Sequence, residues 1–297
     1  MKRSLRLLAM VMVVMMLVGF MTVNAKCKDG TINTYDVDAG GFNLKMEISD
    51  INSKYTVIFE HGLGGDRTWW DLIQPEIAKQ YNTVSYDRAG AGESQHSTNP
   101  RLFSTMCQEL HTALKNAKVK GPYIFIGHSY GGPLSRMYKS MYPKEVAGII
   151  FVDVSHEDMM ERMEPYLGKE LMEQMYTELT GVEDNTKESI MASFQEMRDI
   201  RSLDALRETP ITVLTATTHY GGESEEEWMK MQDEMAALSN NSKHDIIPGG
   251  HFIPLEQPEI VIDAVYELVS RISGKPKNQS CPQFDKKEDC KVKHKIF

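Results

Sequence analysis

Apolar residues along the chain fall into short runs that alternate with longer stretches of helical periodicity. The runs are Tyr55–Glu60, Thr83–Tyr86, Tyr123–Ile126, Val146–Val152, Ile211–Ala216 and His244–Ile247. The helical patterns lie near residues 101–118, 131–142, 224–239 and 258–273. This alternation is typical of a mostly parallel sheet that helices cover on both faces. Ahead of it, residues 31–50 predict an antiparallel hairpin of two strands around Gly40-Gly41.

One interval breaks the alternation. Residues 155–208 contain no strand-like run and are rich in Met, Glu and Leu. Within it, Leu167, Leu171, Met175 and Leu179 lie at helical spacing. We predict a helical cap inserted between two strands of the sheet. Its methionines either line a pliable apolar pocket or pack against the domain below.

The first residues form a candidate leader. Lys2, Arg3 and Arg6 give a positive start, and the stretch Leu7–Val23 is almost continuously apolar. This pattern predicts a signal peptide cleaved after Ala25. The alternative is an uncleaved membrane anchor, because the apolar run approaches the length that spans a bilayer. Both interpretations place the domain outside the cytoplasm.

Charge and ligand spacing exclude several classes of function. The formal net charge is −9 and becomes more negative if the leader is removed. An acidic surface argues against nucleic acid as a partner. The sequence has neither a tight metal-ligand spacing nor a glycine-rich phosphate or dinucleotide loop. We therefore expect no metal and no cofactor.

Four cysteines remain after the predicted cleavage: Cys27, Cys107, Cys281 and Cys290. An even number in an exported protein favours disulfides. Cys281 and Cys290 flank a short polar stretch that a local bridge can close, which leaves Cys27 to pair with Cys107. Free buried thiols are the alternative.

The main chemical motif is Gly127-His128-Ser129-Tyr130-Gly131. It follows an apolar strand and precedes a helical segment, which is the setting of a nucleophile elbow. The chain turns sharply there, and the flanking glycines remove side chains that would collide. We predict that Ser129 is a nucleophile exposed at the carboxyl edge of the sheet.

A second glycine-rich loop, His61-Gly62-Leu63-Gly64-Gly65, follows the strand Tyr55–Glu60. A serine nucleophile that attacks a carbonyl requires two N–H donors for the oxyanion. In this arrangement one donor is the residue after the nucleophile, Tyr130, and the other comes from the earlier loop, for which we assign Leu63.

The candidate general base is His251, in a loop between the last apolar run and the last helix. Among the other histidines we expect His219 to be a surface or structural residue. The acid that orients the base is less clearly marked. The loop after Ile211–Ala216 has no Asp, so the candidates are Asp153, at the end of the strand Val146–Val152, and Glu223.

Together these residues resemble the α/β-hydrolase superfamily. The likeness runs from about Tyr55 to Ser270 and rests on four motifs in the family's order: His61-Gly62-Leu63-Gly64-Gly65, Tyr86-Asp87-Arg88-Ala89-Gly90-Ala91-Gly92-Glu93-Ser94, the elbow, and Gly250-His251-Phe252. The resemblance implies that the stretch with Asp87-Arg88 is a structural loop beside the oxyanion hole. Some members, including the haloalkane dehalogenases, carry the acid after the strand equivalent to Val146–Val152, which favours Asp153.

The predicted organisation is a signal peptide (1–25), a hydrolase core in two parts (26–154 and 209–273), a helical cap (155–208) and a polar Cys-containing tail (274–297). The predicted function is a secreted serine hydrolase that cleaves a small-molecule carboxylic ester. Its catalytic residues are Ser129, His251 and Asp153, with Glu223 as the alternative acid. Membrane contact is expected only through an uncleaved leader. An aminopeptidase, thioesterase, lactonase or acyltransferase on the same scaffold is an alternative, as is a non-catalytic ligand-binding protein.

Overall fold

A computed structural model describes residues 30–201 and 204–274 of the chain. Its strands are β1 (Asn33–Asp38), β2 (Asn43–Ser49), β3 (Thr56–Glu60), β4 (Asn82–Tyr86), β5 (Tyr123–His128), β6 (Val146–Val152), β7 (Ile211–Thr218) and β8 (Ser242–Gly250). Its helices are η1 (Arg67–Trp70), α2 (Gln74–Ala78), α3 (Phe103–Asn116), α4 (Gly131–Met141), α5 (Met159–Leu167), α6 (Lys169–Leu179), η2 (Val182–Asp184), α7 (Lys187–Asp199), η3 (Asp204–Leu206), α8 (Glu223–Ala237), α9 (Ile253–Glu256) and α10 (Pro258–Ser273).

The strands form one sheet in the order β1-β2-β4-β3-β5-β6-β7-β8. β1 and β2 pair antiparallel, as the hairpin prediction required, and β2 also runs antiparallel to β4. From β4 to β8 every neighbouring pair is parallel. The mostly parallel sheet that the alternation predicted is therefore confirmed.

Successive residues of the central strands pack into two separate hydrophobic cores, because neighbouring side chains of a strand point to opposite faces of the sheet. On one face Ile58, Phe125 and Ile149 pack with residues of α3 and α4. On the other face Ile124 and Ile150 pack with residues of α2 and α10. Burial on both faces explains why these strands are apolar throughout.

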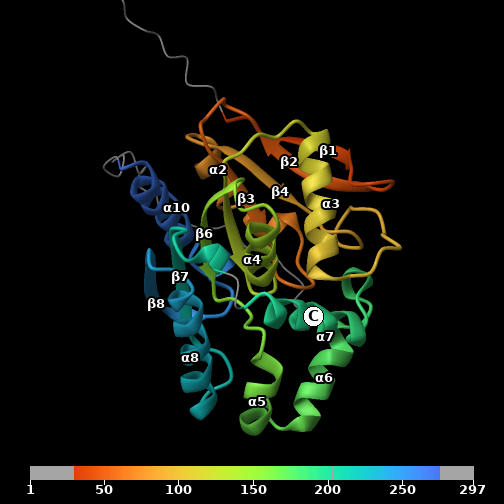
Figure 1. Ribbon diagram of the computed structural model, residues 1–297, viewed down its shortest axis with the longest axis vertical. Helices are drawn as coiled ribbons and strands as arrows, with labels where there is room; N and C mark the ends of the chain where they lie inside the picture. Colours follow the sequence, from red (N-terminus) through yellow and green to blue (C-terminus); the bar gives the residue numbers. More distant parts are fainter. Residues whose placement is uncertain (1–29, 202–203, 275–297) are drawn as a thin grey trace, which may run out of the picture.

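The segment between β6 and β7 carries α5, α6, η2, α7 and η3. Figure 1 shows α5, α6 and α7 together below the sheet, at the opposite end of the view from the β1–β2 hairpin. The helical spacing from Leu167 to Leu179 does not form one helix. Gly168, with φ of 82°, separates α5 from α6, and Leu171 is exposed. Met175 and Leu179 line a cavity described below.

Of the residues on which the export and disulfide predictions rest, the structure describes Cys107. Cys107 is a free thiol buried on α3, and its Sγ lies 3.4 Å from the carbonyl oxygen of Leu134 on α4. The predicted pairing of Cys107 with Cys27 is corrected, because this thiol packs inside the core. The leader and the Cys281–Cys290 pair lie outside the described residues. Within 30–201 and 204–274, no helix has the length and apolar character needed to cross a bilayer.

Candidate active site

Ser129 lies at the sharp turn between β5 and α4. Its φ of 52° is in the left-handed region, which is strained for a residue with a side chain. A Cβ on Gly127 would lie 2.5 Å from the carbonyl oxygen of Gly131, and one on Gly131 would lie 2.4 Å from that of Glu60. Only glycine fits at either position, so the elbow motif is explained by close backbone packing.

The loop after β3 lies directly against the elbow. A Cβ on Gly62 would lie 3.3 Å from Cβ of Ser129 and 3.2 Å from Nδ1 of His128. The next residue, Leu63, lines the same cavity as Ser129 and Tyr130. The two residues predicted as oxyanion donors thus line the same cavity as the Ser129 side chain.

A buried arginine holds this loop in place. Arg88 donates to the carbonyl oxygens of His61 (2.7 Å) and Gly62 (2.9 Å), and it forms a two-pronged ion pair with Glu183 of η2. Glu183 also accepts the backbone N–H of Gly64 at 3.0 Å. Arg88 and Glu183 are both almost completely buried. The cap is therefore tied through one carboxylate to both ends of the glycine-rich loop.

The predicted base and acid are in contact. Nδ1 of His251 lies 2.5 Å from Oδ2 of Asp153. Asp153 follows β6, is fully buried and has a φ of 46°. Its other oxygen accepts the backbone N–H of Ala216 and the indole N–H of Trp228, both at 3.0 Å. The contact leaves Nε2 of His251 as the nitrogen available for a reacting group.

The surroundings of Asp153 favour its ionised form. Burial opposes ionisation, but the hydrogen bonds from His219 and His251 and their charges outweigh it and lower the pKa of Asp153. A carboxylate that stays charged at neutral pH can fix the tautomer of a histidine base.

His128, inside the elbow motif, supports the loop that carries His251. Its Nε2 donates to the backbone oxygen of His251 at 2.9 Å, and the two rings lie 4.6 Å apart. Burial lowers the pKa of His128 to about 3, so this histidine is neutral. Its ring is a fixed hydrogen-bond donor beside the base, a role that the sequence did not mark.

The alternative acid does not reach the base. Glu223 is exposed at the first position of α8 and has no hydrogen bond to His251. The residue that reaches the site from this loop is His219, which was expected to be a surface or structural histidine. Its Nε2 lies 2.6 Å from Oδ2 of Asp153. The ring is therefore not a surface group, because the end of β7 brings it against the buried carboxylate.

Ser129 and His251 open onto one cavity of about 490 Å³. They share it without a hydrogen bond between the serine hydroxyl and the imidazole. Catalytic contacts of this kind often form only when substrate binds. The cap supplies most of the apolar wall: Met159, Met160, Met175, Leu179, Ile190 and Phe194. Three cap methionines, Met159, Met160 and Met175, thus line the cavity with the candidate nucleophile. Two others, Met163 and Met172, pack with residues of α8 in a separate apolar cluster.

The side chains of Asp153, His219 and His251 lie close enough together to face one cation. They bond one another directly, however, since both histidines contact the same carboxylate oxygen at 2.5 and 2.6 Å. The arrangement is that of a hydrogen-bonded chain.

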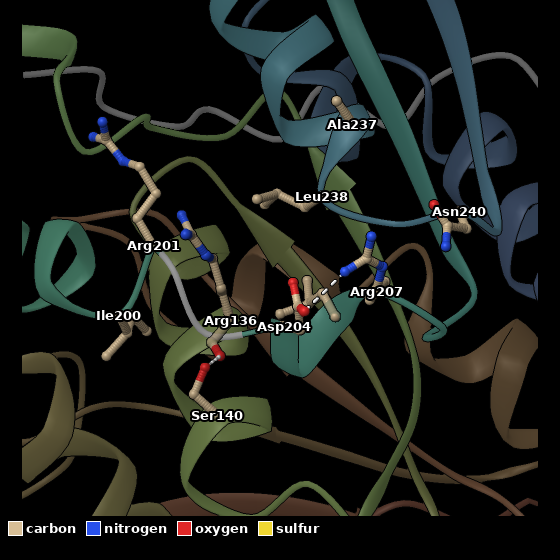
Figure 2. A pocket seen from close by; sticks show the side chains of 10 residues that line it. Arg136, Ser140, Ile200, Arg201, Asp204, Arg207, Ala237, Leu238 and Asn240 are labelled. Atoms are coloured by element: carbon tan, nitrogen blue, oxygen red, sulfur yellow. Dashed lines mark hydrogen bonds and ion pairs between the residues drawn. The ribbon is translucent and has the colours of Figure 1, made fainter.

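A second hollow, of about 260 Å³, shares no lining residue with this cavity. Figure 2 shows three arginines around it, with Arg207 directed at Asp204. Arg136 and Arg201 both bond to Glu157 at 2.9 Å. Arg201 also bonds Asp158, so each of the three guanidinium groups has a carboxylate partner.

Comparisons with known proteins find relatives of this chain. The chain is 27% identical over 239 residues to the uncharacterized protein YqjL of Bacillus subtilis, which covers 79% of this chain and 90% of that protein. An AB hydrolase superfamily protein of Gibberella zeae is 35% identical over 104 residues, 34% of this chain and 32% of that protein.

Solved structures share the fold at low sequence identity. A putative lipase from Acinetobacter baumannii superposes with a TM-score of 0.64 at 17% identity, covering 82% of this chain and 93% of that one. A thermophilic esterase from Thermogutta terrifontis gives 0.58 at 20% identity, covering 82% and 99%. The epoxide hydrolase CorEH gives 0.59 at 14%, covering 82% and 100%. The family model described as alpha/beta hydrolase fold matches residues 55–205, and the chain belongs to this family.

Proposed function

We propose that this hydrolase cleaves carboxylic esters through an acyl-enzyme on Ser129. The observation that carries the proposal is the contact between the buried Asp153 carboxylate and Nδ1 of His251, beside the cavity that Ser129 lines. A strained serine next to a histidine held by a carboxylate is the arrangement that activates a hydroxyl for acyl transfer.

In this mechanism Oγ of Ser129 attacks the ester carbonyl carbon while His251 takes the hydroxyl proton on Nε2. The backbone N–H groups of Leu63 and Tyr130 hold the oxyanion, and each such donor contributes about 3 kcal/mol of transition-state stabilisation. His251 then gives the proton to the departing alkoxide. Water, deprotonated by His251, releases the carboxylic acid from Ser129 and restores the enzyme.

The nucleophile distinguishes this reaction from others on the same fold. The resemblance to dehalogenases and epoxide hydrolases does not extend to their chemistry, because those enzymes use an Asp nucleophile where this chain has Ser129. Amides, thioesters and lactones need the same attack on a carbonyl and remain alternative substrates of the same site. A non-catalytic binding protein would have no need of a strained serine beside a histidine–carboxylate pair.

We further propose that the acyl or alcohol part of the ester is apolar. The cap wall of the cavity consists of methionine, leucine, isoleucine and phenylalanine side chains. Methionine adapts its shape easily, which suits chains of differing length better than one rigid substrate.

The test is labelling with a fluorophosphonate probe and turnover of p-nitrophenyl esters of increasing chain length. We expect Ser129→Ala to lose both activities. Ser140→Ala on the same helix serves as the matched control, because its hydroxyl bonds only the backbone oxygen of Arg136. Lactones and prolyl arylamides in the same panel distinguish the alternative substrates. Unchanged turnover by Ser129→Ala overturns the proposal.

The location of the enzyme is a separate proposal. The positive start and apolar stretch of residues 1–25 support export, with cleavage after Ala25. N-terminal sequencing of secreted protein should begin at Lys26. Intact leader in the membrane fraction would favour the anchored form instead.

A further inference from the structure

His219 lies between two carboxylates. Its Nε2 is 2.6 Å from Oδ2 of Asp153, and its Nδ1 is 2.7 Å from Oε2 of Glu225. Only 4% of its side chain is exposed. A carboxylate accepts hydrogen bonds but does not donate them, so a ring that donates to both must carry a proton on each nitrogen. The geometry points to an imidazolium at His219.

Glu225 is held firmly on the far side of this ring. Its Oε1 accepts the backbone N–H groups of His219, Tyr220 and Gly221, each at 2.7 Å. Burial opposes its ionisation, but these hydrogen bonds and the bond from His219 outweigh it and lower the pKa of Glu225. The carboxylate that faces Nδ1 of His219 is therefore charged.

The other groups around His219 carry no opposing charge. The Trp228 ring lies 4.7 Å away, that of Tyr220 6.4 Å and that of His251 6.0 Å. Partial desolvation and the nearby charges of Asp153 and Glu225 raise the pKa of Tyr220, so its hydroxyl is neutral. Burial lowers the pKa of His219 itself, but the hydrogen bonds and charges of Asp153 and Glu225 outweigh this and raise it.

The two histidines share one acceptor atom. His251 and His219 both bond Oδ2 of Asp153, while the backbone N–H of Ala216 and the Trp228 indole occupy Oδ1. A carboxylate that faces one imidazolium already has its charge largely balanced. It therefore stabilises a second imidazolium, at His251, less than a free carboxylate would.

We propose that His219 and Glu225 are positioning residues that balance the charge of Asp153 and so keep His251 unprotonated, and able to act as a base, at acidic pH. The inference rests on the proposed function, since it takes His251 as the general base. It assigns a role to the loop after β7, where the sequence offers a histidine in place of the expected aspartate.

The decisive variant is Glu225→Gln. The amide oxygen can still accept the three backbone N–H groups, and the amide nitrogen can donate to Nδ1 of His219. The neutral His219 then still donates to Asp153 from Nε2, so every hydrogen bond survives while the positive charge of His219 and the negative charge of Glu225 are both lost. A purely structural role is left intact by this substitution.

The measurement is the pH profile of kcat/KM on p-nitrophenyl butyrate, which does not itself titrate. We expect the acid limb of the Glu225→Gln profile to move to higher pH by up to about one unit. The lost positive charge of His219 lies 6.0 Å from the His251 ring, whereas the lost negative charge of Glu225 lies on the far side of the His219 ring and offsets it only in part. The plateau at higher pH should stay within about threefold of the wild type. Glu226→Gln, an exposed neighbour on the same helix, should leave the limb in place.

His219→Gln provides a second test, because its amide can donate to Asp153 without a charge. It should move the limb in the same direction. If neither variant folds, the ¹⁵N shifts of His219 in the wild-type protein decide: protonation of both ring nitrogens at pH 7.5 supports the proposal, and a neutral ring overturns it.

An acid limb that stays at its wild-type pH in Glu225→Gln overturns the inference, whether or not the plateau falls. That outcome differs from failure of the proposed function, in which the wild type is not labelled by the fluorophosphonate or Ser129→Ala keeps its turnover.

Discussion

Two buried charge networks lie near Ser129, one at the glycine-rich loop and one at Asp153, and they are built from different groups. On the side of the glycine-rich loop, Arg88 pairs with Glu183 and fixes the carbonyls of His61 and Gly62. On the side of the acid, Asp153 bonds two histidines, and one of these bonds Glu225. The first network links the sheet to the cap through Glu183, and the second links the end of β6 to α8 through Glu225.

The difference between them lies in the positive group. A guanidinium does not lose its proton in a protein, so Arg88 keeps its positive charge at every ordinary pH. An imidazole titrates near neutrality, so the network around His219 can respond to pH. The histidines next to Arg88 and the elbow, His61 and His128, are instead kept neutral, since burial lowers the pKa of both. The Arg88 network thus holds the glycine-rich loop in position, and the network around His219 influences the protonation of His251.

The largest effect is expected from breaking the acid side. Asp153→Asn should lower kcat by about 10³–10⁴-fold, because an amide can fix the wrong tautomer of His251 and stabilises its protonated form poorly. Glu223→Gln, at the exposed start of α8, should change kcat by less than about twofold. Steady-state kinetics of both folded variants give the answer. A nearly normal Asp153→Asn enzyme would remove Asp153 from the triad.

Breaking the other side should affect stability more than chemistry. Arg88→Met leaves the Glu183 carboxylate buried without its ion-pair partner, which typically costs about 3–5 kcal/mol of unfolding free energy. Lys187→Met is the matched control, because it breaks an exposed ion pair with Glu173 of the same cap. Such surface pairs contribute about 1 kcal/mol or less. Urea unfolding compares the two, and equal losses would contradict a special role for the Arg88 network.

A milder substitution in the Arg88 network tests whether Glu183 aligns the glycine-rich loop or shapes the pocket. Glu183→Gln keeps an acceptor for the N–H of Gly64 but weakens the grip of the cap on the loop that carries Leu63. We expect kcat to fall about tenfold with a smaller change in KM, since the oxyanion forms only after substrate binds. Glu178→Gln, an exposed cap residue, should leave both constants unchanged. A change confined to KM would mean that Glu183 shapes the pocket and does not align the loop.

The fold was largely predictable because its signal is local. The run Val146–Val152 has the bounds of β6, and the hairpin around Gly40-Gly41 forms as expected. Apolar runs mark buried strands whatever their partners. The cap was predictable as helical, but its break at Gly168 and the exposure of Leu171 were not. Whether a side chain at helical spacing meets a partner depends on the tertiary structure.

The site was predictable only where a motif or chain order marked it. Ser129 has its glycines, and the structure brings Asp153 and His251 together as the order of strands suggested. No comparable signal marks Glu183, which meets Arg88 across 95 residues, or His219, which meets Asp153 across 66. Such pairs arise where the ends of different strands and the cap converge. One clue was present: a loop that lacked the usual Asp but contained a His.

The smallest predicted effect is on the pH dependence of stability. His128 and His219 should change it in opposite directions. His128 stays neutral in the folded protein, with a pKa of about 3, but takes up a proton near pH 6.5 once unfolded. The unfolded state therefore binds more protons as the pH falls, and His128 makes the protein less stable in acid, by about 1 kcal/mol between pH 7.5 and 5.5.

For His219 the sign is opposite. Its folded pKa is raised, so its contribution to stability is present below the unfolded value and is lost as the pH rises through the folded one. Relative to the wild type, His128→Gln should gain unfolding free energy between pH 7.5 and 5.5, while His219→Gln should lose it. Urea unfolding at the two pH values gives the unfolding free energy of each variant and of the wild type. Subtracting the wild-type value removes the contribution of the titrating groups that both proteins share. Shifts of the same sign would show that the two buried histidines titrate alike, and the contrast between the two sides of the site would not hold.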